Sequence, residues 1–159
     1  MREILFRGKR VDDGEWFEGY YAKVNNYLTE KEEHIILPLD TTLYPPSILY
    51  SHTDISHYEV VDPKTVGQFT SLIDKNGNKV FEGDILAYRL EDSENETIDG
   101  VVKYGEFNCS CCDGVYGWYI EGGNIRALDM RKCYDDDERL YVIGNIHDNP
   151  ELLEEKNNV

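Results

Sequence analysis

The chain lacks any apolar stretch long enough to cross a membrane, and its first seven residues are too few and too charged for a signal peptide. We therefore expect the protein to stay in the compartment where it is made. It has only four cysteines, and a reducing compartment keeps thiols free by default, so disulfide cross-links are not expected. At 159 residues the chain is long enough to bury a core without such cross-links.

Positive charge is also scarce, with 16 Lys and Arg against 32 Asp and Glu and a net charge of −16. Residues 82–159 carry 19 acids against 7 bases, so most of the negative charge lies in the second half. A surface of this sign repels phosphate backbones, which makes nucleic acid an unexpected partner. A high net charge also keeps proteins soluble, and solubility alone is sufficient to explain the charge of this chain.

The composition favours strands over helices, because 12 tyrosines and five phenylalanines accompany only two methionines. Residues 4–7 and 15–21 form one expected hairpin, and the Asn76-Gly77 pair between apolar runs predicts a second, with a type I′ turn. Further strands are expected at 35–37, 85–90, 98–104, 116–120 and 140–143. Asn149 and Pro150 predict a final helical turn.

The segment that follows the second hairpin predicts a corner of the sheet. Gly77 supplies the turn, Gly83 allows the chain to bend after Phe81 and Glu82, and Asp84 is placed to accept hydrogen bonds from nearby backbone. Such a corner is similar to those of small SH3-like barrels, so the expected fold is mainly β, with barrel units built from hairpins. The run Phe17-Glu18-Gly19 echoes Phe81-Glu82-Gly83 and raises the hypothesis of two related hairpins.

The sequence offers no pattern that is typical of a catalytic or metal centre. Cys109, Cys111, Cys112 and Cys133 could hold zinc only with unusual spacing, since zinc motifs place two or more residues between paired cysteines. The four histidines are scattered, and no serine lies in a nucleophile elbow. The acidic runs 91–96 and 135–138 lack the glycine and terminal glutamate of a calcium loop, so we expect solvated loops, no metal and no cofactor.

Aromatic side chains are the candidates for a binding surface, although core packing competes for them. Trp16, Tyr20, Tyr21, Trp118 and Tyr119 could present an exposed platform, because aromatic residues are enriched at the centres of interfaces. His147 is expected to form a hydrogen bond in a turn or at an interface. Unpaired strand edges favour pairing between identical chains, which predicts a symmetric homo-oligomer.

Six segments, taken together, carry a resemblance to a known family. They are MREILFR (1–7), GEWFEGY (14–20), VGQFTSL (66–72), DKNG (74–77), FEGDI (81–85) and IGNIHDNPELL (143–153). In this order the chain resembles the YopX family of phage and prophage proteins. The stretch around 44–46 and the cysteine-rich residues 109–112 depart from that pattern. The resemblance implies association with mobile genetic elements and provides no catalytic residues.

These observations lead to a set of expectations about function. The protein is expected to be a nonenzymatic accessory protein of a phage or prophage, cytoplasmic in the host bacterium, that self-associates and binds an unknown host or phage protein. One alternative is an acidic decoy of a host DNA-binding protein, and another is a hydrolase that uses carboxylates or a cysteine-held metal. Residues 1–60 are expected to form an N-terminal β segment, and residues 61–159 are expected to form a C-terminal barrel-like domain. The alternative is that both parts form one continuous domain.

The cysteine spacing generates a first testable prediction. Metal analysis of the purified protein should find no stoichiometric zinc, and a chelator should leave its unfolding midpoint unchanged. One zinc ion per chain, together with a loss of stability on chelation, would show that the unusual spacing does bind metal.

Overall fold

The computed structural model describes residues 3–26, 28–40, 43–44, 54–55, 57–89, 97–109, 112–122, 125–133 and 140–154. The chain divides into two compact units, Met1–Gln68 and Phe69–Val159. The division falls later than the expected one after residue 60, because the intervening residues pair with strands of the first unit. Each unit is antiparallel, and the expectation of a mainly β protein is confirmed.

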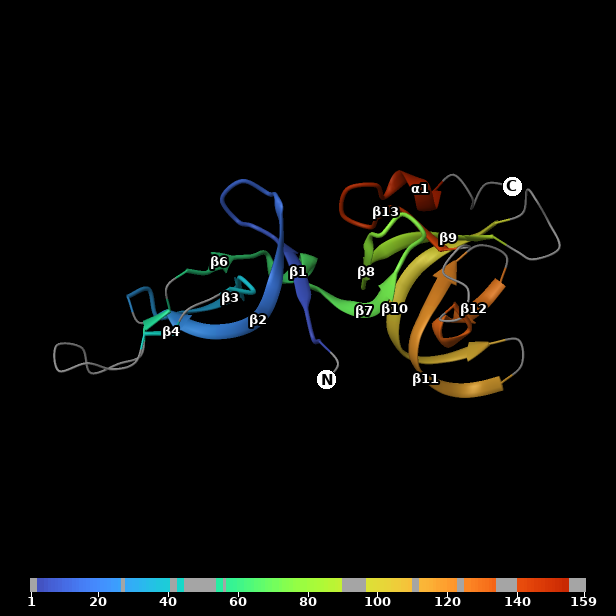
Figure 1. Cartoon of the computed structure of the whole chain (residues 1–159), viewed down its shortest axis with the longest axis horizontal. Helices are drawn as coiled ribbons and strands as arrows, with labels where there is room; N and C mark the ends of the chain where they lie inside the picture. The colour runs from blue at the N-terminus through green and yellow to red at the C-terminus, as the bar shows by residue number, and fades with distance from the viewer. Residues whose placement is uncertain are drawn as a thin grey trace. The chain divides into compact units, whose positions relative to one another are not determined.

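The main sheet of the first unit has its strands in the order β6, β3, β2, β1 and the beginning of β7 (Figure 1). A separate two-stranded sheet joins β4 to β5. The bounds are β1 Phe6–Lys9, β2 Trp16–Asn26, β3 Lys31–Leu37, β4 Leu43–Tyr44, β5 Asp54–Ile55, β6 Glu59–Val60 and β7 Gly67–Ile73, with a short 3-10 helix at Pro63–Thr65.

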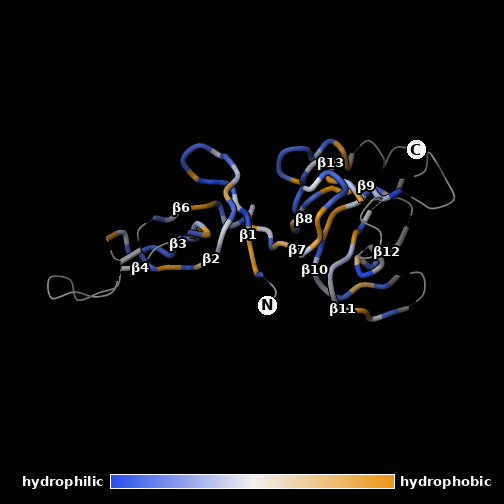
Figure 2. The backbone as a smooth tube through the Cα atoms, in the orientation of Figure 1, coloured by the Kyte–Doolittle hydropathy of each residue, from blue (hydrophilic) through white to orange (hydrophobic). Residues whose placement is uncertain are grey.

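The predicted first hairpin is confirmed as β1 and β2, which pair from Phe6 opposite Gly19 to Lys9 opposite Trp16. Its turn contains Gly14 at a φ of 75°, a backbone conformation that glycine adopts without strain. The carboxylate of Asp13 accepts a hydrogen bond from the backbone N–H of Glu15 at 2.9 Å. Figure 2 shows that this loop is hydrophilic over most of its length, as a solvated turn should be.

The fully buried apolar side chains of the first unit are Leu5, Ile35, Ile36 and Val61, from the chain before β1, from β3 and from the residue after β6. Successive side chains of a strand point to opposite faces, so Ile35 and Ile36 cover both faces of β3. Gly8 leaves the room that Val61 occupies, because a Cβ atom at that position would lie 3.1 Å from the Val61 Cβ. The strand predicted at 35–37 is confirmed.

The second unit consists of the rest of β7 with β8, and a sheet in the order β12, β11, β10, β9, β13. Strands predicted at 85–90, 98–104, 116–120 and 140–143 are confirmed, whereas β12 was not predicted. Among the described residues neither sheet order returns to its first strand, so the predicted barrels are not confirmed. The bounds are β8 Lys79–Phe81, β9 Asp84–Arg89, β10 Thr97–Cys109, β11 Cys112–Gly122, β12 Ile125–Asp129 and β13 Leu140–Asn145, with a 3-10 helix at Met130–Cys133 and the short helix α1 at Glu151–Glu154.

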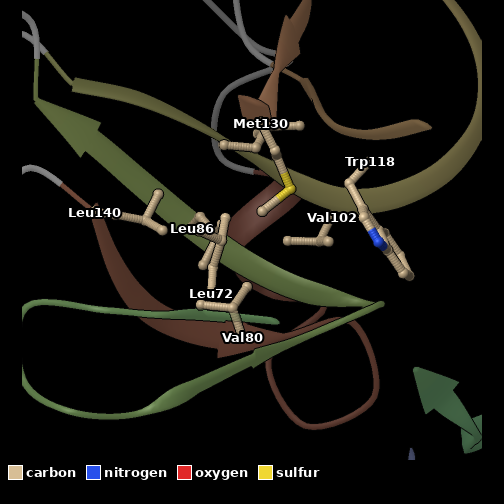
Figure 3. Close-up of a cluster of buried hydrophobic side chains, with 8 residues drawn as sticks. Leu72, Val80, Leu86, Val102, Trp118, Met130 and Leu140 are labelled. Atoms are coloured by element: carbon tan, nitrogen blue, oxygen red, sulfur yellow. The ribbon is translucent and has the colours of Figure 1, made fainter. Parts of the chain in front are cut away.

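The core of the second unit collects side chains from nearly every one of its strands (Figure 3). Removing this apolar surface from water supplies the main driving force for folding the unit. The buried members are Leu72, Val80, Leu86, Val102, Trp118, Ile120, Met130 and Leu140.

Strands β10 and β11 form a long, strongly curved ribbon (Figure 1). Val102 lies opposite Ile120 and Tyr104 opposite Trp118, which places these four side chains on the face that includes the core. Gly105 lies opposite Gly117, and a glycine inside a strand often marks a bend. Beyond this glycine pair the ribbon continues past the core to Cys109 and Cys112.

Candidate functional site

The loop between β7 and β8 is organised by the carboxylate of Asp74. Its oxygens accept hydrogen bonds from the backbone N–H groups of Asn76 and Asn78 at 2.9 and 2.8 Å, and from the Asn78 side chain at 3.0 Å. Two backbone hydrogen bonds close the loop: the N–H of Gly77 donates to the carbonyl of Asp74, and the N–H of Asp74 donates to the carbonyl of Asn78. Asp74 is 3% exposed, whereas Asn76, Gly77 and Asn78 are exposed, so the loop lies at the surface with its carboxylate turned inward.

The hairpin predicted at Asn76-Gly77 is present, but the predicted type I′ turn is wrong. That turn needs positive φ at both residues, whereas here Gly77 has a φ of 86° and Asn76 is not among the described residues with positive φ. The hydrogen bonds are instead those of a three-residue loop that ends in a left-handed glycine. The Asp74 carboxylate favours this longer loop because it accepts hydrogen bonds from the N–H of Asn76 inside the loop and from the N–H of Asn78 directly after it.

The same carboxylate reaches the edge strand of the five-stranded sheet. Asp74 accepts a hydrogen bond from the backbone N–H of Val142 at 3.1 Å, and the N–H of Lys75 donates to the carbonyl of Leu140 at 3.1 Å. Burial raises the pKa of Asp74, but the hydrogen bonds from Asn78, Val142 and Asn76 outweigh burial and lower the pKa below its ordinary value. The ionised carboxylate thus joins the β7–β8 hairpin to β13.

The corner after Phe81 joins three further strands. Gly83, at a φ of 83°, donates its N–H to the carbonyl of Val102 on β10 and accepts at its own carbonyl from the N–H of Ile146, just after β13. The buried Asp84 carboxylate accepts from the N–H of Phe81 at 2.8 Å, the type of backbone bond expected for it. Glu82, between Phe81 and Gly83, is exposed.

The echo between residues 17–19 and 81–83 does not extend to the backbone. Gly19 lies inside β2 and is not among the positive-φ glycines, whereas Gly83 forms a turn. A Cβ atom on Gly19 would lie 2.0 Å from the carbonyl oxygen of Leu37, so Gly19 allows the close approach of β3. The two glycines therefore serve different purposes, and the hypothesis of related hairpins is not supported.

The predicted interface residues fall in different environments. Trp16 is half-buried, and the Arg7 guanidinium lies 4.5 Å from its ring centroid, while Tyr20 is 43% exposed. Trp118 is only 9% exposed and packs in the core of the second unit, so its placement at an exposed interface is corrected to core packing. The backbone N–H of His147 donates to the Asn145 side chain at 2.9 Å, and an interface role for His147 stays a prediction.

Two exposed tyrosines beside Trp118 were not singled out from the sequence. Tyr104 is 51% and Tyr116 is 67% exposed, and their rings meet edge to face with centroids 5.3 Å apart. Tyr104 also packs against Trp118 at 4.8 Å, and Glu106 lies opposite Tyr116 in the strand register. We call Tyr104, Glu106 and Tyr116 the tyrosine surface. The signal for it was the pair of glycines at 105 and 117, which marks where the ribbon leaves the core.

A row of polar side chains crosses β2 and β3 in the first unit. The Tyr21 hydroxyl and His34 Nδ1 are 2.6 Å apart, and Lys23 pairs with Glu32 at 2.8 Å. This hydrogen-bonded pairing lowers the pKa of Glu32 and raises that of Lys23. Glu32 lies 3.6 Å from His34 Nε2, too far for the orienting hydrogen bond that a catalytic triad requires. The row is therefore a set of cross-strand surface pairs.

Among the side chains that the structure describes, no three His, Cys, Asp or Glu residues come together to hold a metal ion. Cys109 and Cys112 are register partners at the end of the ribbon, but Cys111 and the thiols of all four cysteines lie outside the described residues and side chains. No helix in the described ranges combines the length and the apolar character of a membrane span.

The fold and its surfaces define a mainly β protein of two compact units, in which one ribbon presents exposed tyrosines. The chain belongs to the YopX family, whose family model, described as YopX protein, matches residues 5–154. The resemblance found in the sequence is thereby confirmed. The structure is similar to the crystal structure of protein EF1440 from Enterococcus faecalis, with 25% identity, a TM-score of 0.53, and coverage of 96% of this chain and 99% of that chain. The curated proteins include no match to the chain.

The Asp74 network generates the second prediction. Asp74→Asn should lower the free energy of unfolding at neutral pH by about 3 kcal/mol, because hydrogen bonds to a buried charge are lost. The Asp74 pKa is lower in the folded state, so this stabilisation is full above the ordinary value near 3.8 and disappears as the pH falls through the folded value. Denaturant unfolding at several pH values measures both effects.

The matched control is Asp113→Asn, which removes the same charge from an exposed position on β11. It should change stability by no more than about 0.5 kcal/mol. A stability gap between Asp74→Asn and the unmodified protein that stayed constant down to strongly acidic pH would show that the carboxylate charge does not matter.

Proposed function

We propose that this protein is a nonenzymatic accessory protein, encoded by a phage or prophage, that acts by binding another protein. Membership of the YopX family supports the link to mobile genetic elements, and the observation that carries the binding role is the tyrosine surface. Aromatic side chains give large contact areas at low entropic cost, which is why they are enriched at binding sites. A partner that covered Tyr104 and Tyr116 would bury both rings.

The tyrosine surface is well built for contact because its rings are held in place. Tyr104 packs on the buried Trp118, and Tyr116 packs edge-on against Tyr104. Rings that are fixed before binding lose little further freedom when a partner docks. The shared YopX segments, by contrast, include Gly77, Gly83 and Asp84, whose described contacts support the corner. The residues shared with the family therefore support the scaffold, and the proposed binding surface lies apart from them on β10 and β11.

We further propose that the protein self-associates through a sheet edge. The five-stranded sheet ends in β12 on one side and β13 on the other. Backbone groups of β13 are already engaged by Asp74 and Lys75, which reduces its capacity to pair with another chain. β12 is the terminal strand on the opposite side, and terminal strands favour edge pairing.

Cross-linking in bacterial lysate tests the binding role. The unmodified protein should capture one specific partner, and Tyr104→Ser/Tyr116→Ser should lose it, because both ring contacts disappear. Tyr58→Ser is the matched control, since Tyr58 is an exposed tyrosine of the first unit. If the double variant captures the same partner in the same amount, the tyrosine surface is not the binding site, and enrichment of chaperones alone would argue against the role itself.

Sedimentation velocity over a wide range of concentrations tests self-association. We expect a dimer or a larger closed assembly at high concentration and a shift towards monomer on dilution. A single monomeric species throughout would contradict the edge-pairing proposal without affecting the proposal that a different protein binds.

A further inference from the structure

We infer that the tyrosine surface binds an arginine-rich segment of a protein partner, by stacking guanidinium groups on the tyrosine rings beside the Glu106 carboxylate. The inference deepens the proposed binding role and rests on it. Three observations carry it: an exposed aromatic pair, an acid next to it, and the strong negative charge of the chain.

The ring geometry leaves aromatic faces accessible. Tyr116 and Tyr104 meet at an interplanar angle of 88°, so the edge of one ring touches the face of the other and the rings form two walls. Tyr116 is the more exposed of the two at 67%. The face of an aromatic ring attracts a cation within about 6 Å of its centroid, and two perpendicular rings can contact the same cation.

Glu106 places a negative charge at the same spot. It is the register partner of Tyr116 and lies two residues from Tyr104, so all three side chains share one face of the ribbon. The Glu106 side chain is exposed, and no ion pair to it occurs among the side chains that the structure describes. The nearby cation Lys103 points to the other face, where it pairs with Glu121. A cation from a partner would therefore meet both a ring face and a carboxylate.

Arginine suits this surface better than lysine does. Its planar guanidinium stacks on aromatic rings and forms two parallel hydrogen bonds with a carboxylate, whereas an ammonium is a compact and strongly hydrated charge. The first unit contains an intramolecular contact between a guanidinium and an aromatic ring, since the Arg7 guanidinium lies 4.5 Å from the centroid of the Trp16 ring. The net charge of −16 would also accelerate the approach of a basic segment.

Fluorescence anisotropy with a labelled oligoarginine peptide tests the inference, with oligolysine and oligoglutamate as comparison probes. Oligoarginine should bind more tightly than oligolysine, and oligoglutamate should not bind. Tyr104→Ser, Tyr116→Ser and Glu106→Gln should each weaken oligoarginine binding about fivefold, the effect of one cation–π or charged contact. Tyr116→Phe should retain most of the affinity, because the ring and not the hydroxyl makes the contact.

Two controls separate a specific surface from general charge attraction. Glu151→Gln removes one exposed charge from α1 of the same unit, and Tyr58→Ser removes one exposed ring from the first unit. Both should bind oligoarginine within about twofold of the unmodified protein. Far-ultraviolet dichroism of each variant verifies that the fold is retained, and Glu106→Gln, at an exposed position, supplies a readout even if a serine variant is unstable.

The inference would be overturned if Glu151→Gln weakened oligoarginine binding as much as Glu106→Gln, since binding would then follow net charge alone. It would also be overturned if the unmodified protein did not bind oligoarginine. In the latter case, capture from lysate that still depended on Tyr104 and Tyr116 would leave the proposed binding role intact and exclude only the basic partner.

Discussion

The second unit depends on one buried carboxylate, because Asp74 organises a loop and fastens it to another strand at the same time. It accepts from Asn76 and Asn78 within the hairpin and from Val142 on the edge strand β13. A buried charge is tolerated only when its hydrogen bonds replace the water it has lost, and here four donors do so. The adjoining corner, with Gly83 and the buried Asp84, then connects β8 to β9, β10 and β13.

This arrangement gives the segments of the family pattern a structural role. Gly77, Gly83 and Asp84 are engaged with backbone atoms of their own unit, so their described contacts hold strands in register. The surface that we propose for a partner lies elsewhere, on the ribbon of β10 and β11, where Tyr104 and Tyr116 extend the aromatic row beyond the buried Trp118. A rigid scaffold that positions the binding residues is a common way to build a binding protein.

The sequence was sufficient for much of the fold, because strand alternation and the Asn76-Gly77 signal depend on neighbouring residues only. It failed where contacts outside the local pattern decide. The turn type depends on the Asp74 carboxylate, which also accepts a hydrogen bond from Val142 on β13, and β12 is a short strand that, among the described residues, pairs with β11 alone. Interface composition placed Trp118 among the candidates for an exposed platform and did not single out Tyr104, whereas Trp118 is buried and Tyr104 is exposed, since strand alternation gives the face of a strand but not where the core ends. The tyrosine surface could therefore not be found from alternation alone.

Carbon-detected NMR titration of the Asp74 carboxyl group tests the central claim most directly. The account predicts a midpoint below 3.8, and a change in the amide chemical shift of Val142 with that same midpoint, because its hydrogen bond weakens when the carboxylate is protonated. An ordinary midpoint for Asp74, with a Val142 amide that does not respond, would contradict the claim that this carboxylate joins the hairpin to β13.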